Sequence, residues 1–219
     1  MEIDQEKIEF FQKQLLEWYK LNGRKFPWRN KSATNYERII SEVLLQRTKA
    51  ETVAKYFPKF IKRYPSWKQL GNASEKDLIE ILKPFGLSTQ RGKRPYKLAQ
   101  ELKKRKGVFP QDRSVVEEIP MMGQSISNAY ELFILKIPSP LLDVNMARVI
   151  ERFFGKRKLV DIRYDPYLQS TSHKLVDHYQ AKEINWAVLD LGAQVCKPRK
   201  PSCRMCPIIT NCSTRFTSL

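Results

Sequence analysis

The stretch Val115-Val116-Glu117-Glu118-Ile119-Pro120-Met121-Met122-Gly123 decides the fold, because a short helical pattern in it runs into a tight turn. A further helix is predicted to begin at Ser125 or Ser127 and to continue through Leu135. The predicted order is therefore helix, hairpin, helix.

Helical periodicity also dominates the rest of the chain, whereas the alternating pattern of strands is scarce. Amphipathic spacing predicts helices at 8–18, 36–48, 96–104 and 182–193. We therefore expect an all-α protein.

Capping residues indicate the start of two further helices. Ser74-Glu75-Lys76-Asp77 resembles a capping box, and Pro84 with Gly86 closes the short helix that follows. Asp143 or Asn145 can cap another helix. The basic, poorly periodic residues 156–167 are expected to form a loop.

The charge balance points to a polyanionic partner. The 219 residues include 40 Lys and Arg against 23 Asp and Glu, which gives a formal net charge of +17. Nucleic acid is the first partner to consider, although a generic basic protein would have the same composition. No apolar run approaches the ~18 residues of a membrane helix, and the acidic start Met1-Glu2-Ile3-Asp4 is unlike a secretory signal. We expect an intracellular protein, cytoplasmic or in the nucleoid.

The four cysteines are spaced as Cys196-x6-Cys203-x2-Cys206-x5-Cys212. One close pair with two longer loops favours an iron–sulfur cluster over a single ion. Zinc is the alternative, although structural zinc sites more often have two short arms, and disulfides or free thiols are a third possibility. The loop also carries basic residues suited to phosphate, namely Lys197, Arg199, Lys200 and Arg204.

Several motifs together resemble the helix-hairpin-helix (HhH-GPD) DNA glycosylases that carry a 4Fe-4S cluster. These motifs are the cysteine spacing with the preceding Leu191-Gly192-Ala193-Gln194-Val195, Ile119-Pro120-x-x-Gly123, Leu142-Asp143-x-Asn145, Ser41-Glu42-Val43-Leu44-Leu45-Gln46-Arg47-Thr48 and Arg24-x-x-Pro27-Trp28-Arg29. The resemblance extends from about residue 15 to 213 and is strongest to the MutY-type adenine glycosylases and the related thymine/uracil mismatch glycosylases.

The resemblance implies a two-domain architecture. A six-helix barrel domain with the hairpin is expected at 24–135, and an iron–sulfur domain at 1–23 and 136–219, with the active site in the cleft between them. Cys196, Cys203, Cys206 and Cys212 are expected to bind a 4Fe-4S cluster. The expected partner is double-stranded DNA with a mispaired or damaged base, bound by a monomer.

The resemblance also assigns the catalytic residues. Glu42 is expected to protonate the flipped base, Asp143 to stabilise the sugar cation or assist water, and Asn145 to arrange the site. Burial in the base pocket would raise the pKa of Glu42. From the residues alone, Asp143 is equally well an N-cap residue, whereas an exposed helical glutamate is the favoured interpretation of Glu42.

Three segments are expected to contact DNA. Gln46, Arg47 and Thr48 match positions that face the minor groove and the opposite base, although an exposed polar helix end is an equal alternative. The loop with Ser88, Thr89, Gln90 and Arg91 is expected to fill the gap left by the flipped base. The hairpin contributes Met122, Gly123, Gln124 and Ser125.

The hairpin departs from the family pattern at Met121 and Met122, and at Ile126, which replaces a usual threonine. Met121 and Met122 stand where relatives have Gly and an aliphatic residue, which weakens or reshapes the phosphate anchor unless the two methionines fill a core gap. Ser125 stands where a lyase-type relative has the Schiff-base lysine. We therefore expect base removal without strand cleavage.

The expected substrate is a base that is mispaired with guanine. Thymine or uracil is the first choice for the excised base, and adenine is the next. The chain ends seven residues after Cys212, so the C-terminal domain that checks for 8-oxoguanine is expected to be absent. One residue argues against this preference: Ser125 stands where the thymine/uracil enzymes tend to have tyrosine and the adenine enzymes have serine. The alternatives are a non-catalytic iron–sulfur DNA-binding module and, less favoured, an iron–sulfur electron carrier.

Overall fold

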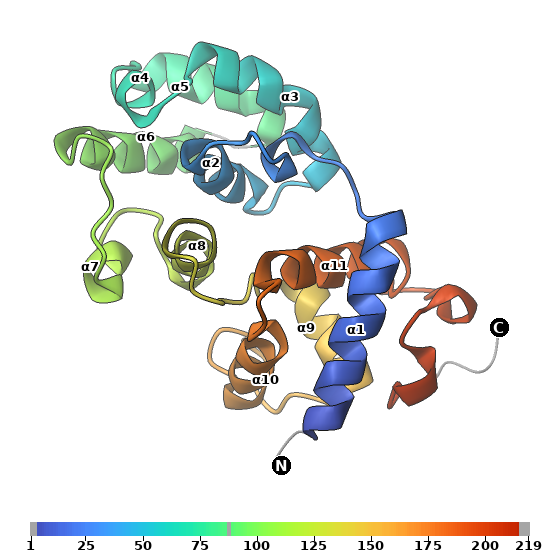
Figure 1. The fold of residues 1–219 in the computed structure, drawn as a ribbon. Coiled ribbons are helices and arrows are strands. Elements are labelled where there is room, and N and C mark those ends of the chain that lie inside the picture. The colour runs from blue at the N-terminus through green and yellow to red at the C-terminus, as the bar shows by residue number, and fades with distance from the viewer. Residues whose placement is uncertain (1–3, 87–88, 215–219) are drawn as a thin grey trace. The chain divides into compact units, whose positions relative to one another are not determined.

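The computed structural model describes residues 4–86 and 89–214, with the side chains of 89–94 outside the description. No strand is present in this part of the chain, which confirms the predicted all-α class. The chain divides into two compact units (Figure 1). One is Lys25–Leu135, and the other joins Met1–Arg24 to Lys136–Leu219.

The unit Lys25–Leu135 is built from short helices. Their bounds are η1 Pro27–Arg29, α2 Asn35–Leu45, α3 Ala50–Arg63, α4 Trp67–Gly71, α5 Glu75–Leu82, η2 Lys83–Phe85, α6 Thr89–Lys104, α7 Arg113–Glu117, α8 Gln124–Tyr130 and η3 Glu131–Leu135. The core includes Trp28, which stacks on Phe26 and meets Phe57 edge-on.

Helix α2 begins where its cap requires and ends earlier than predicted. Thr34 and Glu37 form a reciprocal capping box at its start. The predicted end at Thr48 is wrong, because the helix stops at Leu45 and Arg47 takes a left-handed backbone with φ 60°. That conformation cannot continue a right-handed helix.

The hairpin follows the predicted order of helix, turn and helix. Helix α7 leads into a turn in which the Met122 amide donates to the Ile119 carbonyl, and α8 begins at Gln124. The predicted single helix through Leu135 needs correction, since α8 ends at Tyr130 and η3 is wound more widely, as a π-helix.

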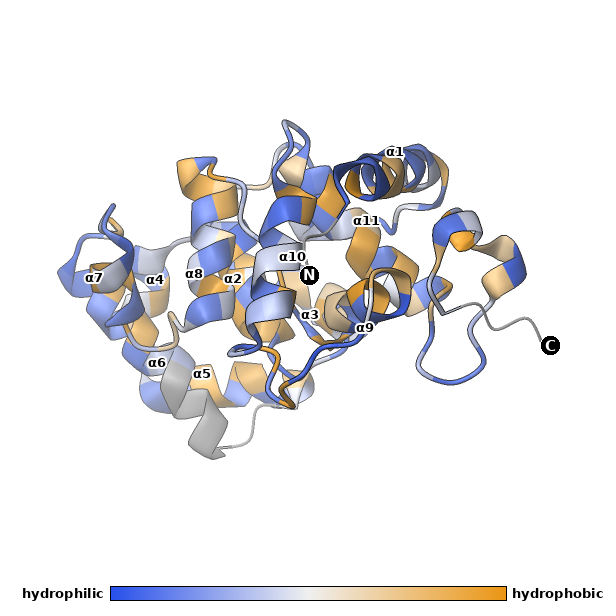
Figure 2. Cartoon of the chain, turned by 90° about the horizontal axis from the view of Figure 1, so that it is seen from below, coloured by the Kyte–Doolittle hydropathy of each residue, from blue (hydrophilic) through white to orange (hydrophobic). Residues whose placement is uncertain are grey.

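The second unit packs three helices around α11. Its elements are α1 Gln5–Asn22, α9 Val144–Phe153, α10 Pro166–Val176, α11 Ala181–Gln194, η4 Cys203–Met205 and η5 Ile209–Asn211. Helices α1, α9 and α10 contact α11 (Figure 1). Figure 2 shows both hydrophobic and hydrophilic residues in these helices, as is typical of amphipathic helices. The apolar residues meet in one core, which contains Ile8, Phe11, Leu15, Ile150, Phe153, Ile184 and Leu191.

Buried polar groups fix the ends of this unit's segments. The Arg24 amide and Nε donate to the two oxygens of Asp190, over 2.8 Å and 2.6 Å, and Asp190 is fully buried. Asn185, also fully buried, accepts from the Leu141 amide and donates to the Ser139 carbonyl. The segment that leads to α9 is therefore tied to α11.

Among the described residues, no helix is long and apolar enough to cross a membrane.

Candidate active site and cysteine cluster

Asp143 is the N-cap residue of α9, and hydrogen bonds hold both of its carboxylate oxygens. Oδ1 accepts from the amides of Asn145 and Met146, each over 2.8 Å. Oδ2 accepts from Asn145 Nδ2, also over 2.8 Å. The side chain is half-buried. Three N–H donors therefore stabilise the negative charge and fix the direction of the carboxylate.

Asn145 connects Asp143 to Arg148. Its Nδ2 donates to Asp143, and its Oδ1 accepts from Arg148 Nη2 over 2.9 Å. An arginine can only donate and an ionised carboxylate can only accept, so these two neighbours determine the orientation of the amide. Asn145 thus has the position of a residue that arranges Asp143.

Arg148 ties the start of α9 to the end of α11. Its Nη2 donates to the Gly192 carbonyl over 2.7 Å, and its Nε donates to the Cys196 carbonyl over 2.8 Å. Burial lowers the pKa of this guanidinium, while the Cys196 thiol and the Asp143 carboxylate act in the opposite direction. A continuous set of hydrogen bonds therefore runs from the first cysteine to Asp143.

Gly192 lets α11 approach the site closely. A Cβ atom at this position would lie 3.0 Å from Asn145 Cβ and 3.2 Å from the Asn145 carbonyl oxygen. These distances are shorter than ordinary van der Waals contact, so a side chain here would push against the residue that orients Asp143.

Glu42 lies on α2 and is half-buried, one residue from the fully buried Ser41 and Val43. It belongs to the unit Lys25–Leu135, whereas Asp143 belongs to the other unit. The structure therefore brings Asn145 to Asp143 within one unit and locates Glu42 on the helix predicted for it.

The residues after α2 form a turn that is attached to the end of η2. Gln46 is the C-cap residue, Arg47 is exposed, and the Thr48 hydroxyl donates to the Phe85 carbonyl over 2.7 Å. Phe85 is followed by Gly86, whose left-handed φ of 70° suits glycine. Ser88 lies outside the described residues. The predicted loop is wrong for Thr89, Gln90 and Arg91, because α6 begins at Thr89; their side chains are not described.

The predicted hairpin residues differ in exposure. Gly123 and Ser125 are exposed and Gln124 is half-buried, whereas the Met122 side chain is fully buried. The Met122 carbonyl also accepts from the Ser127 hydroxyl over 2.9 Å. Met122 thus fills the core beneath the turn, while Gly123 to Ser125 lie toward solvent. Met121 has a φ of 72°, the region in which glycine is favoured.

The four cysteines line a single cavity and are free thiols. The other lining residues are mostly apolar, with no acidic residue and no histidine: Val149, Arg152, Phe153, Leu191, Val195, Pro201, Ile208, Ile209 and Thr214. Within the described part of the chain, no three Cys, His, Asp or Glu side chains are arranged to hold one metal ion.

Arg152 and the helix end beside it hold both ends of the cysteine segment. Its Nη1 donates to Cys196 Sγ over 3.4 Å and to the Lys197 carbonyl over 2.8 Å, and its own carbonyl accepts from Cys212 Sγ over 3.2 Å. Burial, together with the neighbouring thiols, raises the pKa of Cys206 to about 11. Metal binding would therefore have to displace thiol protons.

Sequence reasoning did not assign a function to Arg148, Arg152, Gly192 or Asn185. Their contacts join residues more than forty positions apart in the chain. The signal that could have found two of them is the i, i+4 spacing of Arg148 and Arg152 on a capped helix that precedes a cysteine segment.

The chain is similar to known DNA repair proteins. Residues 40–161 match the family described as HhH-GPD superfamily base excision DNA repair protein. A thymine-DNA glycosylase from Aeropyrum pernix is 35% identical over 215 residues, 96% of each chain. An adenine DNA glycosylase from Buchnera aphidicola is 34% identical over 206 residues, 92% of this chain and 58% of the relative.

Solved structures agree with the sequence matches. A structure of a thermostable thymine-DNA glycosylase superposes with a TM-score of 0.86 at 28% identity, covering 95% of this chain and 96% of that one. The likeness thus includes both units and not the hairpin region alone. The chain belongs to the HhH-GPD superfamily of base excision DNA repair proteins.

Proposed function

We propose that the chain is a monofunctional DNA N-glycosylase that removes a base mispaired with guanine from duplex DNA. Thymine and uracil are the first substrates, and adenine opposite guanine or 8-oxoguanine is the next. The observation that carries this proposal is the 96% mutual coverage with a thymine-DNA glycosylase, because it extends over both units. The relative named as an adenine enzyme is matched over only 58% of its length.

The reaction begins with extrusion of the target nucleotide, because its glycosidic bond is inaccessible inside the stacked duplex. A nucleobase is a poor leaving group, so proton donation to the base lowers the barrier. Glu42 is the proposed acid. Its position on α2 is half-buried, so the carboxyl group is partly shielded from water.

Departure of the base leaves positive charge on the sugar, which Asp143 is proposed to stabilise. The carboxylate is held by three N–H donors, so it needs no rearrangement when the charge develops. Asn145 keeps Oδ2 in place, and Asp143 also assists the water molecule that attacks the sugar. The products are the free base and an abasic site.

Strand cleavage is not part of the proposed reaction. A lyase forms a Schiff base between a lysine and the sugar, and Ser125 occupies the matching position. Ser125 is exposed in the structure and has no amine with which to form that intermediate.

We also propose that Cys196, Cys203, Cys206 and Cys212 hold a 4Fe-4S cluster. The donor set fits this group, since four thiols surround one cavity with no carboxylate or imidazole among its lining residues. The bound cluster would hold the basic loop between Cys196 and Cys212 in one conformation, so that the loop could bind phosphate. Iron and sulfide analysis with visible absorption spectroscopy tests this, in wild type and in Cys212→Ala.

The proposed activity is tested by single-turnover excision on labelled duplexes with G:T, G:U, G:A and 8-oxoguanine:A. Alkali then cleaves the abasic sites. We expect the fastest excision from G:T and G:U, and a loss of about a hundredfold or more in Glu42→Gln. Glu101→Gln is the matched control, because it removes the same charge from α6, where Glu101 pairs with Arg105 just after the helix end.

Two outcomes would contradict the proposal. Tight, salt-dependent binding without excision of any base would favour the non-catalytic DNA-binding module. Strand cleavage without alkali, with borohydride trapping of the protein on DNA, would show that another lysine acts as a lyase nucleophile.

A further inference from the structure

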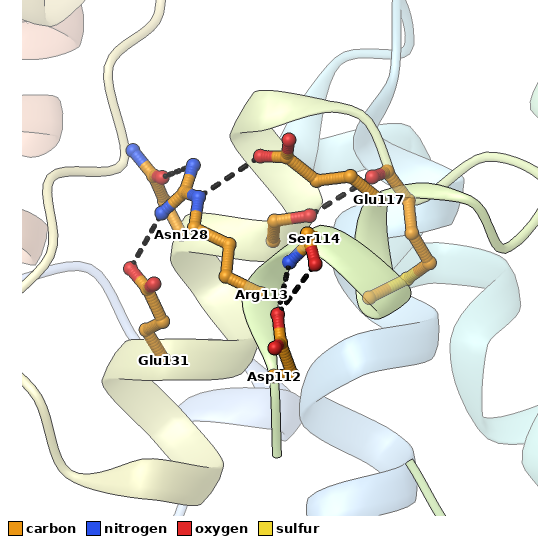
Figure 3. A network of polar contacts seen from close by, with 8 residues as sticks. Asp112, Arg113, Ser114, Glu117, Asn128 and Glu131 are labelled. Carbon is orange, nitrogen blue, oxygen red and sulfur yellow. Dashed lines mark hydrogen bonds and ion pairs between the residues drawn. The ribbon is translucent and has the colours of Figure 1, made fainter. Parts of the chain in front are cut away.

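A polar cluster centred on Arg113 joins the segments on either side of the hairpin turn. The guanidinium donates from Nε to Glu117 over 2.9 Å, from Nη1 to Glu131 over 2.7 Å and from Nη2 to Asn128 Oδ1 over 2.8 Å (Figure 3). Glu117 shares α7 with Arg113, whereas Asn128 lies on α8 and Glu131 on η3. One cation therefore connects the helix before the turn to both segments after it.

The cluster differs from an ordinary surface ion pair. The Asn128 residue is 2% exposed and the Glu131 side chain 14% exposed, so water competes weakly for these contacts. Asp112 also caps α7 by accepting from the Ser114 amide and hydroxyl (Figure 3). The residue that carries the guanidinium is thereby fixed at the first position of its helix.

The turn that these segments enclose is strained. Met121 has a left-handed backbone, which costs a residue with a Cβ atom free energy that glycine avoids. Such a conformation persists where the surrounding structure imposes it. Arg113 holds the two flanking segments together, and the Ser127 hydroxyl holds the Met122 carbonyl from below.

We propose that Arg113 is a positioning residue for DNA binding. With Asn128 and Glu131 it clamps α7 to α8 and η3, and so keeps the turn at Met121 in the conformation that meets the DNA backbone. This inference rests on the proposed function, because the hairpin is taken as a DNA contact. Each of the three side-chain nitrogens of Arg113 already donates to a protein oxygen, so the guanidinium is held in place although the side chain is 37% exposed.

The sign of the effect at Glu131 separates a clamp from simple electrostatics. Removing a negative charge from a DNA-binding protein should tighten binding if only charge matters. For Glu131→Gln the clamp predicts weaker binding, by about fivefold, because the charge-assisted bond to Arg113 is lost. Glu101→Gln is the control, since Glu101 lies on α6 and pairs with Arg105 just after the end of that helix, outside the Arg113 cluster, and its affinity should stay equal or rise.

The salt dependence of Arg113→Ala separates positioning from direct phosphate contact. Loss of one phosphate contact lowers the slope of log K against log salt by about 0.9. A positioning residue weakens affinity, here by about tenfold, with the slope unchanged. Arg105→Ala, with a similar exposure of 34% against 37% for Arg113, is the matched control and should show neither effect.

Relief of the backbone strain provides a rescue test. Glycine adopts the left-handed conformation without the steric cost of a Cβ atom, so a Met121→Gly chain should not need Arg113 to hold the turn. In the Met121→Gly variant, Arg113→Ala should therefore lower the affinity by at most about twofold. Thermal unfolding of every variant checks that each is folded at the assay temperature.

The outcomes are distinct. Weaker binding by Glu131→Gln, an unchanged salt slope and rescue by glycine support the clamp. Tighter binding by Glu131→Gln, a reduced slope in Arg113→Ala or an equal loss in both Met121 backgrounds would overturn it. If the wild-type chain neither binds nor excises from any duplex, the proposed function itself fails, which is a different result.

Discussion

The segment around Asp143 and the turns after α2 and α7 hold their proposed site residues by different means, although left-handed non-glycine residues are not confined to one unit, since Lys200 in the cysteine segment is another. Around Asp143, every oxygen of the carboxylate has a donor, and the supporting residues are joined by hydrogen bonds as far as Cys196. In the unit Lys25–Leu135, the turns after α2 and α7 contain non-glycine residues in left-handed backbone, Arg47 and Met121. A group that stabilises developing charge needs fixed donors, whereas a turn that meets DNA needs a particular backbone shape, even a costly one.

Removal of the charge at Asp143 should give the largest effect. We expect Asp143→Asn to lower single-turnover excision about a thousandfold, because the neutral amide cannot stabilise the sugar cation. The unfolding free energy should change by less than about 1 kcal/mol, since asparagine is also a good N-cap residue. An activity loss below about tenfold would show that Asp143 serves only as a cap.

Loss of Arg148 tests whether the hydrogen-bonded segment from Asp143 to Cys196 depends on one residue. Arg148→Ala leaves the carbonyls of the buried Gly192 and the half-buried Cys196 without this donor, so we expect a loss of about 2 to 3 kcal/mol in urea unfolding. Arg163→Ala, which removes an exposed pair with Asp161, should cost under about 0.5 kcal/mol. Equal losses in the two variants would contradict the comparison.

Two glycines, one in each unit, sharpen the contrast in packing. Gly192→Ala should lower the unfolding free energy by about 1 kcal/mol, because the cost of overpacking against Asn145 exceeds the gain in helix propensity. It should also slow excision, because the added methyl group displaces Asn145. Gly123→Ala should cost less, because nothing lies within 4 Å of the added Cβ atom and only the preference for glycine over alanine at the N-cap of α8 is lost. Chemical denaturation of both variants measures the difference, and a more stable Gly192→Ala would show that α11 can move away.

The smallest effect concerns the strained turn. Met121→Gly should raise the unfolding free energy by about 0.5 kcal/mol, because relief of the left-handed backbone exceeds the entropy that glycine adds to the unfolded chain. Gly86→Ala should act in the opposite direction by about 1 kcal/mol, since Gly86 has a φ of 70°. Thermal unfolding distinguishes the signs, and a destabilised Met121→Gly would show that the turn is not strained.

Local signals predicted much of the fold. The helices with clear apolar periods were found, and Ser74 and Asp143 cap helices as expected. Helices α3, α4 and α10 were not predicted, and α3 contains Pro58, which normally argues against a helix interior. The end of α2 was missed because Arg47 gives no sequence signal for a left-handed backbone.

The candidate site was predictable only in its chemically distinctive members. Asp143 and the cysteines were found from spacing and from the family resemblance, and their catalytic and ligand functions stay predictions. Arg148, Gly192 and the Arg113 cluster could not be found in the same way, because each acts through a contact made by tertiary packing. A polar residue on a helix has the same local pattern whether it faces solvent or a neighbouring carbonyl.

The discontinuous unit has a consequence for biosynthesis. Helix α1 packs against α11, which the ribosome completes only after residue 180, whereas Lys25–Leu135 is contiguous and available to fold first. At about 5–20 residues per second, the apolar stripe of Ile8, Phe11 and Leu15 waits on the order of ten seconds or more for its partner. The newly made amino-terminal helix is therefore the segment for which a chaperone would compete during translation.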